Sequence, residues 1–405
     1  MNIGLVTTWF DRGAGMVSRQ IMKTLLPQHN VWIYARGEKY ASDDPHWNLP
    51  NVHWGRRVHW PGPQRIDRSD FARWIASRRI ETIIFNEQRW WQPVGWAKDL
   101  GITTGAYIDY YTPTTVPHFA AYDFLICNTE RHHSVFQWHN GAHMVPWGTD
   151  TSLYKPTPSQ THNNSSPLRF FHSAGMSPHR KGTDILIEAF TDAARSINAR
   201  LIIHTQTPLQ SGLKKHPSIE IIHRTVPPPG LYSMGDVYVY PSRLDGLGLT
   251  VCEALSCGLP VITTDSPPMS EFVQHGQTGH LVEVARTFPR KDGYYWPVSE
   301  ISKKALTEAL IHAHTNRSAL PTMKAQARAY ACEHRDWKKN SAKLLDIVEN
   351  ATRRPLDADA RRQIEEPATA LERGLERMYE SRIGNTVIQA VLKRYRRARQ
   401  PHLYR

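Results

Sequence analysis

The sequence has few cysteines and no long apolar run. Its four cysteines, Cys127, Cys252, Cys257 and Cys332, are scattered through 405 residues, and no two of them form a CxxC pair. This spacing argues against a zinc site and against a disulfide framework, and favours reduced thiols in a cytoplasmic protein. No window approaches 18 consecutive apolar residues, so we expect no segment that spans a membrane.

Two further signals are missing. The start of the chain, MNIGLVTTWF, lacks the basic residues and the long apolar core of a signal peptide. No Asp-x-Asp motif stands at the end of a predicted strand, so we predict neither a bound metal nor another cofactor. The expected location is the cytoplasm, with peripheral attachment at the inner face of the membrane as the alternative.

What the sequence has in excess is positive charge. The net charge is +13 and the pI is about 9.6. A basic protein favours anionic partners, which are phosphates, nucleic acid or acidic lipid headgroups, and the charge alone does not choose among them. The basic residues concentrate in the tail and are not interleaved with aromatic residues on a sheet. We therefore expect no specific binding of nucleic acid.

Short apolar runs recur along the chain with helical stretches between them, which is typical of parallel strands covered on both faces. In the first half they are residues 2–8, 31–35, 82–86, 103–108 and 124–127. After the polar tract PTPSQTHNNSSP the pattern restarts, with runs at residues 168–174, 200–204, 219–223, 237–241 and 260–264.

These runs predict an α/β protein with two doubly wound, Rossmann-like domains in tandem. The expected divisions are a first domain over 1–155, a linker over 156–167, a second domain over 168–345 and a helical basic tail over 346–405. Doubly wound sheets bind ligands at the carboxyl ends of their strands, and two of them facing each other make a deep cleft.

One stretch, PSRLDGLGLTVCEALSCG (241–258), predicts a strand end, a glycine-containing turn and a helix. Asp245 lies in the turn and Glu253 lies about one turn into the helix. Gly246 and Gly248 let a ligand approach the backbone, and the N–H groups at a helix start favour anions. Carboxylates accept hydrogen bonds from paired hydroxyls, as in a sugar or a ribose. On this spacing alone, a turn aspartate and a surface glutamate remain the simpler interpretation.

A second stretch favours a ligand-binding site over this simpler interpretation. FHSAGMSPHRKGTDILIEAF (171–190) also predicts a strand, a loop and a helix, and it brings Arg180 and Lys181 to the loop just before Gly182. Arginine can hold phosphate oxygens with two hydrogen bonds, and lysine adds a point charge. An isolated Arg-Lys pair is more often a solvated surface. Here the pair is a candidate diphosphate clamp.

Together these segments resemble the family 4 glycosyltransferases, which have the GT-B fold. Residues 241–282 match that family's nucleotide-sugar signature, with its Glu-x7-Glu pair present as Asp245-x7-Glu253. Residues 180–190, 231–242 and 334–345 match further segments of the family. The resemblance covers roughly residues 1–345 and is strongest between 170 and 285. It implies a retaining glycosyltransferase that takes a nucleotide sugar, such as a UDP- or GDP-sugar, as its co-substrate.

The resemblance also implies a role for each matched residue. Glu253 would bind the ribose hydroxyls, Asp245 would hold hydroxyls of the donor sugar, and Arg180 and Lys181 would neutralise the leaving diphosphate. Two departures stand out, because Met176 replaces an arginine frequent in the family and Asp245 is one methylene shorter than glutamate. The backbone N–H groups expected to contact the sugar and the diphosphate belong to Gly246, Leu247, Gly248, Leu249 and Thr250.

The first half of the chain is expected to face the acceptor. Gly13 and Gly15 resemble the family's first glycine loop, which lies across the cleft from the donor. After the strand at 103–108 the family often has a histidine, where this chain has Asp109. Asp109 could bind an acceptor hydroxyl, take its proton or cap a loop. No carboxylate stands out as a nucleophile, so front-face attack is favoured.

The expected acceptor is a glycan or a lipid-linked sugar, in bacterial-type polysaccharide, lipopolysaccharide or glycolipid synthesis. Three other classes stay open: a phosphorylase with pyridoxal phosphate, a nucleotide-sugar-binding protein without catalysis and a basic nucleic-acid-binding protein. In the tail, an apolar stripe on one helix face precedes a basic cluster at 393–399, so the tail packs on the first domain or lies on an anionic membrane. The stripe consists of Val387, Ile388, Val391, Leu392 and Tyr395.

Overall fold

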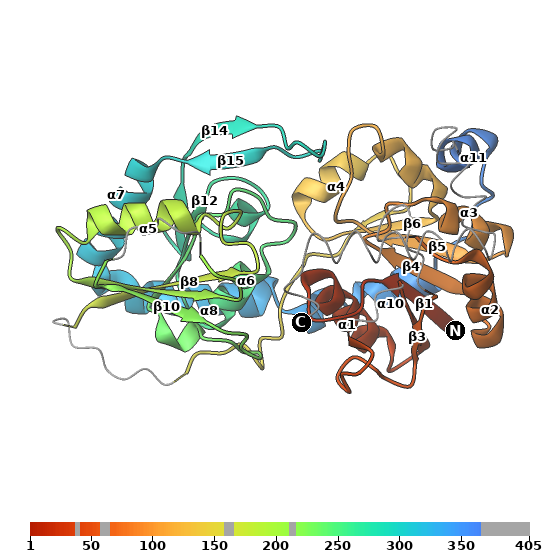
Figure 1. The fold of residues 1–405 in the computed structure, drawn as a ribbon, viewed down its shortest axis with the longest axis horizontal. Helices are drawn as coiled ribbons and strands as arrows, with labels where there is room; N and C mark the ends of the chain where they lie inside the picture. Colours follow the sequence, from red (N-terminus) through yellow and green to blue (C-terminus); the bar gives the residue numbers. More distant parts are fainter. Residues whose placement is uncertain (37–40, 57–64, 158–165, 210–215, 366–405) are drawn as a thin grey trace, which may run out of the picture. The chain divides into compact units, whose positions relative to one another are not determined.

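The computed structural model describes residues 1–36, 41–56, 65–157, 166–209 and 216–365 of the chain. Packing divides the protein into two compact units (Figure 1). Unit 1 consists of Met1–Ile126, His139–His143 and the chain from Leu344 on, and unit 2 consists of Cys127–Trp138 and Met144–Lys343. These divisions differ from the domains expected over 1–155 and 168–345, because residues 127–138 and 144–155 pack within unit 2 and the described residues 344–365 pack within unit 1.

Unit 1 is built on a sheet of seven strands in the order β3-β2-β1-β4-β5-β6-β7. The pairings from β3 through β6 are parallel. Its strands are β1 (Asn2–Thr7), β2 (Asn30–Ala35), β3 (Val52–Trp54), β4 (Thr82–Asn86), β5 (Thr103–Tyr107), β6 (Phe124–Cys127) and β7 (Ala142–Met144). Its helices are α1 (Gly13–Leu25), α2 (Arg68–Arg78), α3 (Gln92–Asp99), α10 (Lys343–Glu349) and α11 (Ala358–Glu365), with the 3-10 helix η2 (Val116–Ala121).

Unit 2 contains a parallel sheet of six strands in the order β10-β9-β8-β11-β12-β13 and an antiparallel pair, β14-β15. Its strands are β8 (Leu168–Gly175), β9 (Ala199–Thr205), β10 (Ile219–His223), β11 (Val237–Tyr240), β12 (Val261–Thr264), β13 (Gly279–Val282), β14 (Val284–Phe288) and β15 (Val298–Ile301). Its helices are α4 (Glu130–Phe136), α5 (Thr183–Ala193), α6 (Leu249–Ser256), α7 (Lys303–Thr315), α8 (Leu320–His334) and α9 (Trp337–Asn340), with the 3-10 helices η3 (Tyr232–Met234), η4 (Met269–Phe272) and η5 (Arg317–Ala319).

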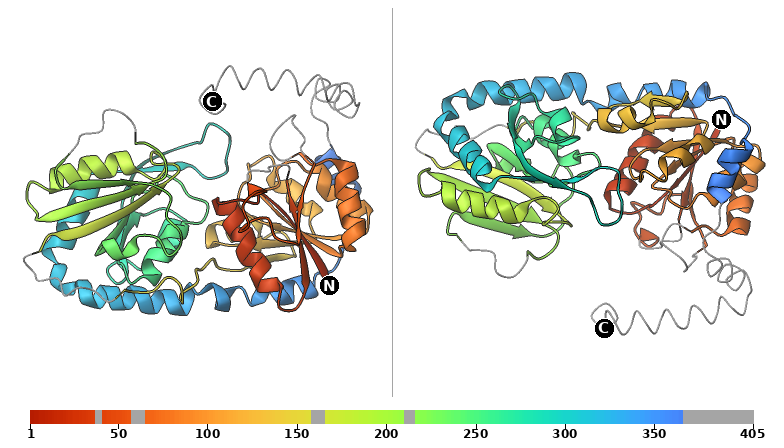
Figure 2. Two further views of the ribbon diagram at one scale, coloured as in Figure 1. Left: turned by 60° about the horizontal axis from the view of Figure 1, so that its bottom comes forward. Right: turned by 90° about the horizontal axis from the view of Figure 1, so that it is seen from above.

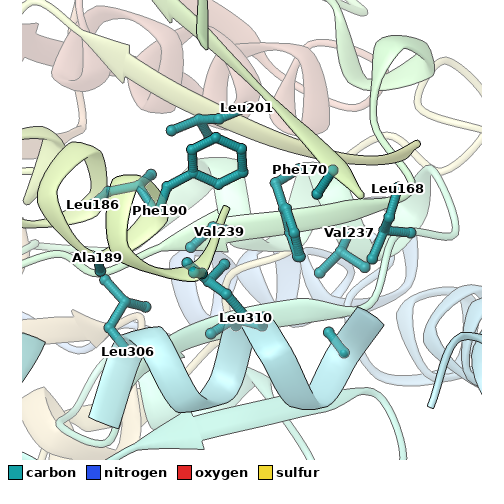
Figure 3. Packing of buried hydrophobic residues seen from close by; sticks show 14 of the residues in the cluster. Leu168, Phe170, Leu186, Ala189, Phe190, Leu201, Val237, Val239, Leu306 and Leu310 are labelled. Carbon is teal, nitrogen blue, oxygen red and sulfur yellow. The ribbon is translucent and has the colours of Figure 1, made fainter. Parts of the chain in front are cut away.

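Helices cover both faces of the six-stranded sheet, with α5 and α7 on one face and α6 and α8 on the other (Figure 2). On the first face, Phe170 and Val239 of the sheet pack against Phe190 of α5 and Leu310 of α7, all with no exposed surface (Figure 3). Burying one such side chain stabilises the fold by about 1.5–3 kcal/mol relative to leaving it in water. This packing explains why the strands of unit 2 read as near-continuous apolar runs.

All ten apolar runs form strands, so the predicted α/β class with two parallel sheets is confirmed. Most of the expected tail, from residue 366 on, lies outside the described residues, and so do residues 158–165 of the expected linker. Residues 351–357 are not helical, whereas α11 follows them as a helix. Among the described helices, none combines the length and the apolar composition that crossing a bilayer requires.

Candidate functional site

Two loops of unit 2 meet at one edge of its sheet. Residues 176–182 connect β8 to α5, and residues 241–248 connect β11 to α6. Because β8 and β11 are parallel neighbours, both loops leave the sheet at its carboxyl edge. They are joined by hydrogen bonds to the carbonyl oxygen of Arg180, which accepts from Arg243 N at 2.9 Å and from Ser242 Oγ at 3.3 Å.

A glycine begins the helix after each loop. Gly182 and Gly248 have φ values of 73° and 65°, in the left-handed region that favours glycine. A Cβ on Gly182 would lie 2.1 Å from the carbonyl oxygen of Pro241, so the two loops can pack only if this residue lacks a side chain. As N-cap residues, these glycines supply no side-chain cap to α5 or α6. The N–H groups of Thr183 and Val251 donate to the carbonyl oxygens of Pro178 and Gly248, and the N–H groups at a helix start favour an anion.

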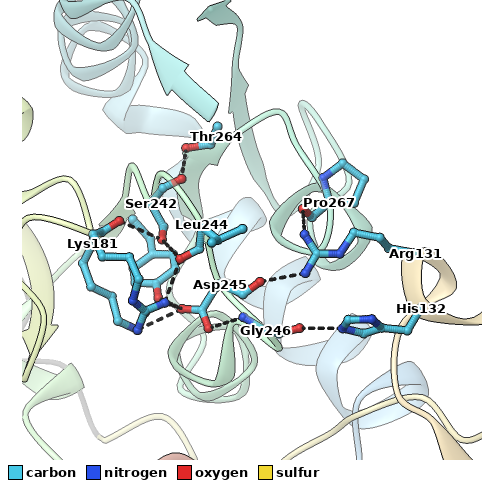
Figure 4. A network of polar contacts seen from close by, with 11 residues as sticks. Arg131, His132, Lys181, Ser242, Leu244, Asp245, Gly246, Thr264 and Pro267 are labelled. Carbon is cyan, nitrogen blue, oxygen red and sulfur yellow. Dashed lines mark hydrogen bonds and ion pairs between the residues drawn. The ribbon is translucent and has the colours of Figure 1, made fainter. Parts of the chain in front are cut away.

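Asp245 is the centre of a cluster of charged and polar side chains (Figure 4). Its Oδ2 accepts a hydrogen bond from Lys181 Nζ at 3.0 Å and lies 3.4 Å from Arg180 Nη1. The Tyr240 hydroxyl donates to the same oxygen and also contacts Lys181. The structure therefore brings together the three candidates Asp245, Arg180 and Lys181, and adds Tyr240, which the sequence analysis did not select.

The charges in this cluster set the protonation of Asp245. Burial would raise the pKa of this carboxyl, but the charges of Lys181 and Arg180 and the hydrogen bond from Tyr240 outweigh burial and hold its pKa well below the usual range. Burial lowers the pKa of Lys181, an effect that Asp245 opposes. The cluster thus carries an ionised carboxylate beside two cations, and an incoming anion would compete with Asp245 for them.

Glu253 lies on α6 and is half-buried, so the alternative interpretation of a surface glutamate is wrong. Burial raises its pKa, although hydrogen bonds from Tyr232 and Tyr154 and the charge of Lys181 partly oppose this. Tyr232 lies 21 residues and Tyr154 lies 99 residues before Glu253, so distant segments of the chain position this carboxylate. Neither tyrosine was selected from the sequence.

Helix α4 contributes a contact that the sequence analysis missed. Arg131 donates from Nη2 to the carbonyl oxygen of Asp245 at 2.8 Å and from Nη1 to that of Pro267 at 2.7 Å (Figure 4). His132 Nε2 lies 3.4 Å from the carbonyl oxygen of Gly246. Because the peptide group is planar and trans, the Gly246 N–H points away from the Asp245 carbonyl oxygen that Arg131 contacts, and it donates to Asp245 Oδ1 at 2.8 Å. Arg131 and His132 thereby orient the backbone of this loop.

The start of α4 is itself fixed to unit 2. The carboxylate of Glu271 accepts from the backbone N–H groups of Glu130 at 2.7 Å and Arg131 at 2.9 Å, an arrangement favoured at a helix N-terminus. The basic-acidic sequence ERHHS at 130–134 gave no signal for this role, because the partners lie more than 100 residues away.

The remaining donor-side candidates lie along the same loop. Leu247, Leu249 and Thr250 are half-buried, and Gly248 is buried as the first residue before α6. A Cβ on Gly246 would meet no atom within 4 Å, so the space beside this backbone is open. Open space next to an uncapped helix start is what a bound phosphate or sugar would need.

In unit 1, the candidates follow two strands of the parallel part of the sheet. Gly13 and Gly15 come after β1, and Asp109 comes after β5, with β4 between these strands. A Cβ on Gly15 would lie 2.1 Å from the carbonyl oxygen of Phe10, so this turn requires glycine, whereas Gly13 has open space around it. Asn86, at the end of β4, donates to the Ala14 carbonyl oxygen at 3.1 Å and links the glycine turn to the next loop.

Asp109 lies in a charged environment at this edge. Burial and the charge of Glu87 raise its pKa to about 7, while the charges of Arg89 and Arg36 act in the opposite direction. Glu87 has a φ of 55°, and its backbone is held by buried Arg36, which donates to its carbonyl oxygen at 2.6 Å. A carboxyl with a pKa near neutrality can exchange a proton at physiological pH, which is the property of a general base.

Among the described residues, no group of three or more His, Cys, Asp or Glu side chains could hold a metal ion. Metal independence stays a prediction.

Comparison with solved structures gives the fold. A glycosyltransferase from Rickettsia africae superposes with a TM-score of 0.70 at 13% identity, covering 86% of this chain and 98% of that one. Anabaena HepE, solved with UDP and glucose, gives a TM-score of 0.65 at 17% identity, covering 86% and 99%. The fold is GT-B.

The GT-B chain also matches a family model over part of its length. Residues 167–290 match the model described as glycosyl transferases group 1. This range contains both loops of unit 2 and all of Arg180, Lys181, Asp245 and Glu253, and it ends within the turn between β14 and β15.

Curated relatives of this GT-B chain include mannosyltransferases. A GDP-mannose-dependent alpha-(1-6)-phosphatidylinositol monomannoside mannosyltransferase of Mycobacterium tuberculosis is 27% identical over 230 residues, which are 50% of this chain and 54% of that protein. The lipopolysaccharide core biosynthesis mannosyltransferase LpsB of Rhizobium meliloti is 26% identical over 157 residues, covering 33% and 44%. The chain thus spans about half the length of the curated relatives it matches.

Proposed function

We propose that this protein is a retaining, metal-independent glycosyltransferase that moves a sugar from a nucleotide-diphosphate sugar to an acceptor hydroxyl. The observation that carries the proposal is the cluster of Asp245, Arg180 and Lys181 beside two uncapped helix starts, within the range that matches the glycosyltransferase family model. Two cations and two helix N-termini at one sheet edge suit a diphosphate.

In the proposed donor complex, each part of the site has one role. Glu253 accepts hydrogen bonds from the ribose hydroxyls, and Tyr232 and Tyr154 position its carboxylate. The diphosphate displaces Asp245 from part of its contact with Arg180 and Lys181, which frees that carboxylate for hydroxyls of the sugar. The backbone N–H groups from Gly246 to Thr250 contact the sugar and the diphosphate, as oriented by Arg131 and His132.

The proposed reaction proceeds at one face of the sugar. The bond between the anomeric carbon and the diphosphate oxygen breaks, and the acceptor oxygen forms its bond to that carbon from the same side, so the configuration is retained. The acceptor proton passes to the departing diphosphate. Arg180, Lys181 and the helix N–H groups stabilise the negative charge that develops on the leaving group, which is where electrostatic stabilisation lowers the barrier.

For the acceptor, we propose a glycan or a lipid-linked sugar in polysaccharide, lipopolysaccharide or glycolipid synthesis. The names of the mannosyltransferase relatives support this class. They also make GDP-mannose the first donor to test, with UDP-glucose second because HepE was solved with UDP and glucose. In unit 1, Asp109 is proposed to bind the acceptor hydroxyl.

A thermal-shift panel of UDP-, GDP-, ADP- and TDP-sugars tests the donor assignment. A ligand that binds the native state raises the unfolding temperature by mass action, so one nucleotide should stand out. Release of the nucleotide diphosphate, measured with the selected donor in EDTA, then tests catalysis without metal. If no nucleotide sugar shifts the unfolding temperature, the assignment of a nucleotide-sugar donor is wrong. If activity is lost in EDTA and restored by a divalent ion, the proposed metal independence is wrong.

A further inference from the structure

Unit 1 contains a basic pocket whose lining includes none of the candidate site residues. Its volume is about 260 Å³, and it lies between the end of α3 and the segment that leads into α11. Four of its six lining residues carry a positive charge. The lining residues are Lys98, Arg353, Arg354, Pro355, Leu356 and Arg361.

One wall of this pocket is fixed by a buried ion pair. Lys98 contacts the carboxylate of Asp123, and their side chains are 4% and 0% exposed. Lys98 Nζ also donates to the Arg354 carbonyl oxygen at 2.9 Å, and the Arg354 N–H donates to Asp123 at 2.6 Å. The backbone at Arg354 is therefore held against α3, so the pocket has a defined shape without a ligand.

The positive charges of the pocket differ in their partners. Arg361 is paired with Asp99 at 2.6 Å and with Glu365 at 2.8 Å, and Lys98 is paired with Asp123. These two cations need no further partner. By contrast, the exposed side chains of Arg353 and Arg354 form no ion pair within the part of the chain that the structure describes.

Like charges crowd this pocket. Burial lowers the pKa of Lys98, and the charges of Arg353 and Arg354 lower it further, against the opposing effect of Asp123. Arg353 Nη1 lies so close to Gly101 that a Cβ there would be 2.7 Å away, which places this guanidinium at the end of α3. A bound anion would relieve the repulsion between these groups.

The geometry points to an anion-binding site in which Arg353 and Arg354 hold a phosphate group, either free inorganic phosphate or the phosphate of a lipid headgroup. A guanidinium presents two parallel N–H groups that match two phosphate oxygens, and two guanidiniums match the double charge of phosphate. This inference does not depend on the proposed glycosyl transfer, because it rests on unit 1 alone.

The test is a titration of the full chain with inorganic phosphate at constant ionic strength, followed by thermal unfolding and calorimetry, with chloride as the reference anion. We expect saturable binding that falls about 10- to 100-fold in the Arg353→Gln, Arg354→Gln double variant, because hydrogen bonds to a charged group are lost. The matched control is Arg195→Gln, Arg200→Gln, which removes two exposed arginines of unit 2 and should bind phosphate as the wild type does.

Flotation with phosphatidylglycerol and phosphatidylcholine vesicles separates the two sources of the phosphate. Binding to the anionic vesicles that free phosphate displaces, and that the double variant loses, assigns the site to a lipid headgroup. Phosphate binding without vesicle binding assigns it to a soluble anion. The inference is overturned if the wild type shows no saturable phosphate binding, or if the double variant binds equally well. If the double variant does not fold, Arg354→Gln alone gives the same comparison.

Discussion

Glu253 is the residue whose substitution reports most directly on donor binding. We expect Glu253→Gln to weaken nucleotide binding about 10- to 100-fold and to abolish most transfer, because a charged acceptor of the two ribose hydroxyls becomes neutral. Calorimetric titration with the free nucleotide measures this change.

Tyr232→Phe is the control for Glu253, because it removes one hydroxyl that contacts the carboxylate and leaves the charge in place. It should cost less affinity than Glu253→Gln. Unchanged nucleotide affinity in Glu253→Gln would contradict the assignment of Glu253 to the ribose.

The two cations beside Asp245 are expected to act on turnover more than on binding. Arg180→Ala and Lys181→Ala should each lower kcat about 100-fold while the affinity for the nucleoside changes little, because their charge is most needed as the diphosphate leaves. Steady-state kinetics at saturating donor measure this, with the exposed Arg195→Ala of unit 2 as the control.

Lys181→Ala has a second consequence, since Asp245 then loses its closest cation. Breaking a buried ion pair destabilises a protein, so the unfolding temperature must be measured for this variant beside its activity. If activity survives the combined removal of Arg180 and Lys181, the diphosphate is held elsewhere.

Asp109 can be assigned by the pH dependence of stability. Its pKa is raised from 3.8 to about 7, so it stabilises the folded state below about pH 4, and this stabilisation is lost as the pH rises toward 7. Asp109→Asn should therefore match the wild type near pH 4 and exceed its unfolding free energy by about 1–3 kcal/mol at pH 8, a range reduced for its partial exposure. Denaturant unfolding at both pH values measures the difference.

The same variant separates the roles left open for Asp109. Loss of transfer together with a gain in stability at pH 8 indicates a carboxylate kept for the acceptor, since functional groups often reduce stability. A loss of stability at both pH values would indicate that Asp109 caps its loop.

At the scale of elements, the two loops of unit 2 depend on glycine for different reasons. Gly182→Ala should destabilise the protein by at least about 2 kcal/mol, because its φ of 73° is unfavourable for alanine and the new Cβ would lie 2.1 Å from the Pro241 carbonyl oxygen. Thermal unfolding measures this loss.

Gly246→Ala is the matched substitution, because a Cβ there meets no atom within 4 Å. We expect it to leave the unfolding temperature nearly unchanged and to weaken donor binding, since the new methyl group enters the space proposed for the sugar and the diphosphate. Equal donor affinity in Gly246→Ala and the wild type would argue that the ligand does not approach this backbone.

At the scale of the whole molecule, the open question is whether the basic tail reaches a membrane. Its apolar stripe and basic cluster lie outside the described residues, so packing and membrane contact both remain predictions from the sequence. We expect any membrane association to be peripheral and sensitive to salt, because each basic residue near an anionic surface contributes about 1 kcal/mol that salt screens.

Flotation with anionic liposomes at low and high salt tests this expectation on the full chain and on a chain ending at Asn385. Binding that persists at high salt, or equal binding of the shortened chain, would contradict an electrostatic anchor in the tail. The chain ending at Asn385 retains Arg353 and Arg354, so the Arg353→Gln, Arg354→Gln variant is needed in the same assay to separate vesicle binding at the phosphate site from vesicle binding by the tail.

The sequence by itself determined the α/β class, the ten predicted strands and the two loops that follow β8 and β11. These features depend on local signals: apolar runs, glycines at helix starts and charged residues directly after strands. For the same reason, Arg180, Lys181, Asp245 and Glu253 could be selected, because each lies within a few residues of a strand end or a helix start. The short strands β3, β7 and β13 and the pair β14-β15 were missed, because their sequences have no sustained apolar pattern.

Only the tertiary structure decided which side chains complete the site and how the chain divides into units. Tyr154, Tyr232 and Arg131 contact Glu253 or the Asp245 loop from positions 21 to 114 residues away in the chain. Such contacts depend on where whole elements pack, and no local pattern encodes them. The same holds for α4 and for residues 344–365, whose places in unit 2 and unit 1 follow from burial and hydrogen bonding, not from their order in the sequence.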